Sequence, residues 1–139
     1  MEHASKRLQE LLDDTLQILD HMEVPEHNHM LLQIKNGLKE QSRKVTELTN
    51  YTSEEILGTA VSIGKNLNEI SQVVILLEAN LLRDYQKSTG DHIDQYQQLS
   101  LEKQMEQTET YHDKIDYLSA VKIRENINRM NEVLLRIRS

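Results

Sequence analysis

The chain has 139 residues, enough for one domain with a buried core, and we expect a single domain over residues 1–139. Its 16 Lys and Arg against 23 Asp and Glu give a formal net charge of −7, and it contains no cysteine. Disulfide scaffolds, thiol enzymes, zinc ribbons and iron–sulfur proteins are excluded, because each of them needs thiolates.

Helix-forming residues dominate the chain, and its one proline and four glycines leave few breaks. Pro25 disfavours a helical conformation at Val24, so one helix is predicted to end near residue 23 and another to begin at residue 26. Polar runs at residues 50–53 and 87–91 mark the next two breaks. The predicted helices span residues 5–23, 26–49, 54–87, 92–118 and 121–138.

Apolar residues recur in steps of three and four within these segments. The third segment is the most regular, because eight successive positions of one stripe are apolar. This pattern predicts an all-α fold: an antiparallel four-helix bundle, with a possible fifth helix, built from long coiled-coil-like helices. The stripe consists of Ile56, Ala60, Ile63, Leu67, Ile70, Val74, Leu77 and Leu81.

The last segment contains a change of phase. The apolar stripe that runs to Ile115 and the one that begins at Ile123 are offset by one residue, and the slip lies between Leu118 and Ile123. Such an offset rotates the stripe by about 100° on a straight helix. Two interpretations remain open. Either the helix is interrupted near Ser119, or it continues and its end faces a different neighbour.

The predicted helices differ in length. At about 1.5 Å per residue the second is about 35 Å long and the third about 50 Å, which leaves about 15 Å of the third uncovered by the second. We expect this surplus to expose an apolar stripe that binds a partner, unless the first helix folds over it. The predicted binding residues are Val74, Leu77, Leu81, Leu82, Tyr85, Ile93 and Tyr96.

Charge and hydropathy narrow the choice of partner. Residues 120–139 carry a net charge of +3 and the remaining chain −10, so we interpret the basic segment as a solvated helix face. The acidic body makes nucleic acid an unexpected partner. The longest unbroken apolar stretch is Val73 to Leu77, and no leader pattern opens the chain, so we expect a cytoplasmic protein without a membrane-embedded part.

The motifs of the sequence indicate a non-catalytic function. The four glycines are isolated from one another, and no G-x-S-x-G elbow or phosphate-binding loop is present. We expect no enzyme activity and no cofactor. The prediction is a protein–protein interaction module of the adaptor, chaperone or inhibitor type, which binds another protein or forms a homodimer.

Histidines near the first turn raise the alternative of a metal-binding bundle. His21, His27 and His29 lie close in sequence to three carboxylates, and neutral imidazole is a good ligand for divalent transition metals. Spacing alone does not orient the rings, so an exposed polar turn explains the cluster equally simply and no metal is expected. Two Glu-x-x-His steps occur, at Glu26–His29 and Glu109–His112, and this spacing contributes to di-iron sites in some helical bundles.

The same turn allows a second alternative. The run from His27 to Leu38 loosely resembles the histidine box of histidine-containing phosphotransfer domains. That resemblance implies a helical bundle with His27 or His29 as phosphoacceptor. The usual box has Lys-Gly three and four residues after the histidine, whereas Leu32 and Gln33 follow His29 at those places.

Overall fold

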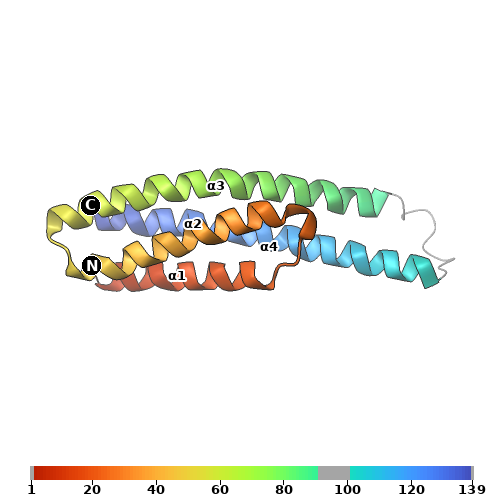
Figure 1. Ribbon diagram of the computed structural model, residues 1–139, viewed down its shortest axis with the longest axis horizontal. Helices are drawn as coiled ribbons and strands as arrows, with labels where there is room; N and C mark the ends of the chain where they lie inside the picture. The colour runs from red at the N-terminus through yellow and green to blue at the C-terminus, as the bar shows by residue number, and fades with distance from the viewer. Residues whose placement is uncertain (1, 91–100, 139) are drawn as a thin grey trace.

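The computed structural model describes residues 2–90 and 101–138 (Figure 1). Four long helices account for almost all of them, and the described residues contain no strand. Two short 3₁₀ helices lie at the connections. In chain order the elements are α1 (Glu2–His21), η1 (Pro25–His27), α2 (Asn28–Glu47), η2 (Leu48–Asn50), α3 (Ser53–Gly90) and α4 (Leu101–Arg138).

The helices begin and end close to the predicted breaks. Pro25 opens η1, so α2 starts at Asn28 rather than at residue 26. Thr52, rather than the following serine, caps α3. Its hydroxyl accepts a hydrogen bond from the amide of Glu55 (3.3 Å), whose carboxylate accepts one from the amide of Thr52 (3.2 Å). This reciprocal pair is a capping box, which needs exactly this three-residue spacing between hydroxyl and carboxylate.

The four helices pack against one another around one core. Contacts join α1 with α2, α2 with α3, α3 with α4, and α4 with α1, so each helix has two neighbours. The start of α1 and the end of α4 lie at the same end of the molecule (Figure 1). The largest of the fully buried side chains come from all four helices and from η2: Leu8, Leu12, Leu19, Ile34, Leu38, Leu48, Ile63, Leu67, Leu77, Ile123, Ile127 and Met130.

The structure decides between the two interpretations that the sequence left open, because α4 runs without interruption from Leu101 to Arg138. Residues 92–100 of the predicted helix lie outside the described residues. The change of phase instead marks a change of surroundings. Ile115 and Leu118 are exposed, whereas Ile123 and Ile127 are fully buried. No proline or glycine lies at this point, so the backbone can continue as a helix while the apolar stripe turns toward a different side.

The helices are unequal in length, as predicted. The 38 residues of α3 span about 57 Å and the 20 residues of α2 about 30 Å. The end of α3 and the start of α4 therefore extend together beyond α1 and α2 (Figure 1). Among the described residues, none of the helices combines the length and the apolar character that crossing a bilayer requires.

Candidate functional site

The predicted binding stripe is not an exposed surface where the structure describes it. Val74, Leu77 and Leu81 have exposed fractions of 0%, 0% and 3%, so these three residues belong to the core. The prediction considered the second helix and, as an alternative, the first helix as cover, and did not consider the last one. In the structure α4 packs along α3, and His27 of η1 reaches the level of Asp84, so the bundle encloses this part of α3.

The other residues of the predicted stripe have different surroundings. Leu82 and Tyr85 are partly buried. Ile93 and Tyr96 lie outside the described residues. The cover that the structure shows for this part of α3 comes from α4 and η1, rather than from the first helix alone.

Exposed apolar side chains occur elsewhere, and they concentrate on α3 and α4. Seven of the eight large apolar side chains that are exposed within the described residues belong to these two helices. The eighth, Leu32, lies on α2. The seven are Leu57, Val61, Ile75, Leu76, Ile115, Leu118 and Leu135.

Three of the exposed residues on α3 share one side of the helix. At about 100° per residue, Val61 lies about 40° from Leu57, and Ile75 lies in line with Leu57. Asn68 falls on the same side, and its Oδ1 accepts a hydrogen bond from Nδ2 of Asn131 on α4 (3.4 Å). This side of α3 therefore borders α4 on the outside of the bundle.

The neighbouring side of α4 contributes one more exposed apolar residue. A Cβ atom at Gly64 of α3 would lie 3.9 Å from Leu134, which places Leu134 and the adjoining Leu135 at the level of Gly64. Leu134 is buried, whereas Leu135 is 61% exposed. Leu135 lies about 40° from Asn131 around α4, on the side toward α3. We call Leu57, Val61, Ile75 and Leu135 the outer α3–α4 face.

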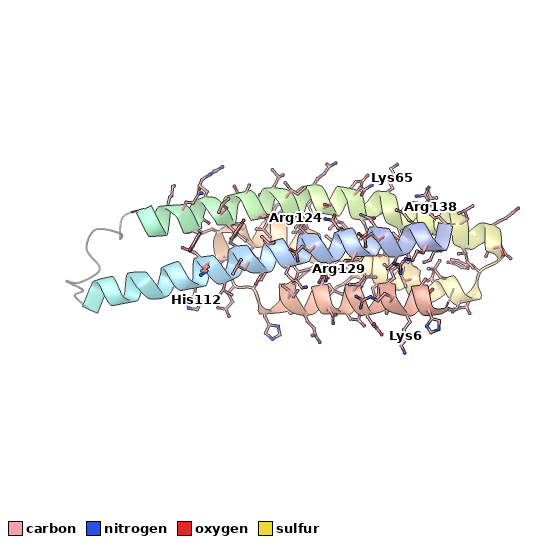
Figure 2. The ribbon with its side chains drawn as sticks, turned by 180° about the vertical axis from the view of Figure 1, so that it is seen from behind. Lys6, Lys65, His112, Arg124, Arg129 and Arg138 are labelled. Atoms are coloured by element: carbon pink, nitrogen blue, oxygen red, sulfur yellow. The ribbon has the colours of Figure 1, made fainter. Side chains whose placement is uncertain are left out.

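A polar pocket of about 490 Å³ lies where the α1–α2 connection meets α3 and α4, and we call it the end pocket. Two imidazoles, His27 and His112, line it together with Lys87. Figure 2 shows His112 toward the start of α4. Five carboxylates also line the end pocket: Glu23, Glu26, Asp84, Asp113 and Asp116.

Three of these groups converge. Nε2 of His27 lies 2.8 Å from Oδ2 of Asp84, and both side chains are partly buried. One ligand atom each of Glu26, His27 and Asp84 lies within 4.8 Å of the others. Pro25 starts the 3₁₀ turn that holds Glu26 and His27 against α3. Residues 57 positions apart in the chain thus meet at one point.

Burial and neighbouring charges shift the pKa of one carboxyl group of the end pocket. The pKa of Asp116 is raised above its ordinary value, mainly because burial removes its carboxyl group from water. The negative charges of Asp113 and Glu23 raise this pKa further, and His112 lowers it. Both the burial of Asp116 and these two neighbouring charges therefore favour the neutral form of its carboxyl group.

The remaining candidate histidines lie apart from this point. His21 is exposed, and its Nδ1 lies 2.7 Å from the carbonyl oxygen of Gln17. His29 is exposed in the first turn of α2. Of the three histidines proposed as ligands, only His27 enters the end pocket. Its Nε2 is engaged by Asp84, and the phosphoacceptor alternative at His27 or His29 stays a prediction.

The basic segment near the end of the chain is only partly a solvated face. Figure 2 shows Arg124, Arg129 and Arg138 spaced along α4. Arg124 donates two hydrogen bonds to the carboxylate of Glu78 on α3, at 2.7 and 3.3 Å. Glu78 holds the pKa of Arg124 above its ordinary value, and this pair joins α3 to α4.

Comparison with known proteins gives no match: no family model, no curated protein and no solved structure matches the chain. What the protein does is therefore inferred from its own geometry.

Proposed function

We propose that the protein is a non-catalytic interaction module that associates with a second copy of itself through the outer α3–α4 face. In this proposal α3 and α4 form the long, coiled-coil-like hairpin of an antiparallel bundle. The observation that carries the proposal is the exposure of Val61, Ile75 and Leu135, at 45%, 51% and 61%, along one side of the hairpin. Exposed apolar groups on a common face are typical of binding surfaces.

The shape of this face suits another helix or helix pair. Leu57 and Ile75 are separated by about 27 Å along α3, which is about five helical turns. Apolar side chains spaced along two neighbouring helices can pack into the grooves of an identical hairpin. Asn68 and Asn131 lie within the face, and a polar pair in such a position favours one register of association over others.

The chemistry of the face favours a second copy over a charged ligand. Its four defining side chains carry no charge, whereas the chain as a whole has a net charge of −7. Burying these uncharged side chains against an identical face stabilises the complex. The absence of cysteine and of a glycine-rich loop from the sequence supports a non-catalytic role.

The test is the mass in solution of the double variant Val61→Asp/Ile75→Asp. We expect the unchanged protein to have twice the 16.3 kDa mass of one chain by size-exclusion chromatography with light scattering. Two carboxylates on the face should weaken association by about 100-fold or more, because each would be buried without a partner. Circular dichroism should show unchanged helix content, since both positions are exposed within one chain.

The matched control is Leu32→Asp, which places a carboxylate at the exposed apolar residue of α2. This variant should associate like the unchanged protein. A mass of 16.3 kDa for the unchanged protein at every concentration measured would contradict self-association. Equal weakening by Leu32→Asp would contradict the assignment to the outer α3–α4 face.

A further inference from the structure

The end pocket carries an inference that is independent of self-association. It lies at the α1–α2 connection, whereas the outer α3–α4 face begins near the opposite end of α3 (Figure 1). We propose that Glu26, His27 and Asp84 form a binding site for a divalent transition metal ion, with zinc as the best-fitting ion.

The first argument is geometric. Ligand atoms around a tetrahedral zinc ion, with bonds of about 2.0–2.2 Å, lie about 3.3–3.6 Å apart. Nε2 of His27 and Oδ2 of Asp84 are 2.8 Å apart, so the two atoms need to separate by about 0.5–0.8 Å to bind an ion. Glu26 already brings a carboxylate oxygen within 4.8 Å of one ligand atom of each of these residues.

The second argument is the kind of donor. An imidazole and two carboxylates suit zinc and related divalent ions, whereas magnesium and calcium prefer sites made of oxygen alone. The chain has no cysteine, so it offers no thiolate to select copper(I) or an iron–sulfur cluster. The imidazole also distinguishes this site from an ordinary surface group of acids.

The third argument is the charge around the three ligands. Five carboxylates and one lysine line the end pocket, a formal charge of −4 when both imidazoles are neutral. A divalent cation reduces this excess of negative charge. His112 and Asp113 line the same pocket from α4, so they add an imidazole and a carboxylate to the surroundings of the three ligands.

The ion would connect parts of the chain that are distant in sequence. His27 and Glu26 belong to η1, and Asp84 belongs to α3. Because the three groups meet only in the folded chain, the ion binds the folded state in preference to the unfolded one. It therefore raises the free energy of unfolding by RT ln(1 + [metal]/Kd).

Isothermal titration calorimetry of the full chain with zinc chloride, after removal of metal by a chelator, tests the proposal. We expect one ion to bind per chain, with an accompanying rise in melting temperature. Glu26→Gln and His27→Gln should each weaken binding by about 10-fold or more, because each removes a ligand. Glu26 is exposed, so Glu26→Gln should leave the fold intact and keep the test valid if His27→Gln unfolds.

The matched control is His29→Gln, which removes an exposed imidazole two positions from His27. It should bind zinc like the unchanged protein. No heat with the unchanged protein, or equal binding by Glu26→Gln and His27→Gln, would overturn the proposal. Equal heats with magnesium and zinc would overturn the choice of a transition metal. A monomeric protein that still binds zinc would contradict the proposed self-association and leave this site standing.

Discussion

The inner and outer sides of α3 are built from the same kinds of residue but have opposite surroundings. Leu67 and Leu77 face the other helices and are fully buried, whereas Val61 and Ile75 are about half exposed. The hydrophobicity of a single residue therefore does not show on which side of α3 it lies. What distinguishes them is the length of the stripe, since the inner side is apolar at eight successive positions and the outer side only at some.

The strongest test of this comparison is to remove side chains from both sides of α3. Leu67→Ala should lower the free energy of unfolding by about 2–5 kcal/mol, because it leaves a cavity in the core. Val61→Ala should change it by less than about 0.5 kcal/mol in dilute solution, where the outer side faces water. Urea unfolding measures both. A loss at Val61 as large as that at Leu67 would contradict the description of an uncovered outer side.

A second test concerns the polar groups inside the bundle. Thr15 of α1 and Asn126 of α4 are both buried, and Nδ2 of Asn126 donates to Oγ1 of Thr15 (3.2 Å). Thr15→Val should cost about 1–3 kcal/mol, because it leaves the buried amide of Asn126 without this acceptor. The double variant Thr15→Val/Asn126→Leu should recover part of that loss.

The exposed bond between Asn131 and Asn68 provides the control for this pair. Asn131→Ala should cost less than about 0.5 kcal/mol, since water can replace the lost partner. Thermal unfolding of the four proteins ranks them. If Asn131→Ala cost as much as Thr15→Val, the distinction between inside and outside would fail for polar groups.

The smallest expected effects distinguish two glycines. A Cβ atom at Gly58 of α3 would have no neighbour within 4 Å, so Gly58→Ala should stabilise the helix by about 0.5–1 kcal/mol. At Gly37 of α2 the same atom would lie 2.9 Å from two side-chain atoms of Ile70. Gly37→Ala should therefore be less stable than Gly58→Ala by about 1 kcal/mol, as judged by the melting temperature. Equal melting temperatures would mean that the side chain of Ile70 moves away from the new methyl group at no cost in stability.

The sequence predicted the all-helical fold and most of the helix ends, because these depend on neighbouring residues. Pro25 and the threonine–glutamate pair that begins α3 act within one turn of the backbone. The phase change near Ser119 was visible too, but the pattern could not decide between a break and a change of neighbour. That choice depends on what packs beside α4.

The candidate sites were harder to predict. Val74, Leu77 and Leu81 were expected on an exposed stripe, because only the first two helices were considered as cover for α3, whereas α4 and η1 provide it. The sequence did not indicate the outer α3–α4 face. Its apolar residues are divided between two helices, and on α3 polar residues such as Asn68 lie between them, so neither helix shows a continuous second stripe.

By itself the sequence determined that the chain forms long helices with an aliphatic inner side, since helix propensity, capping and the three-to-four spacing are local properties. Whether the last part of the chain forms one helix or two was left open. Only the tertiary structure decided which apolar residues stay exposed. It also brought His27 to Asp84, 57 positions away. The contact between His27 and Asp84 depends on where the α1–α2 connection lies along α3. The packing of side chains between the helices determines this position.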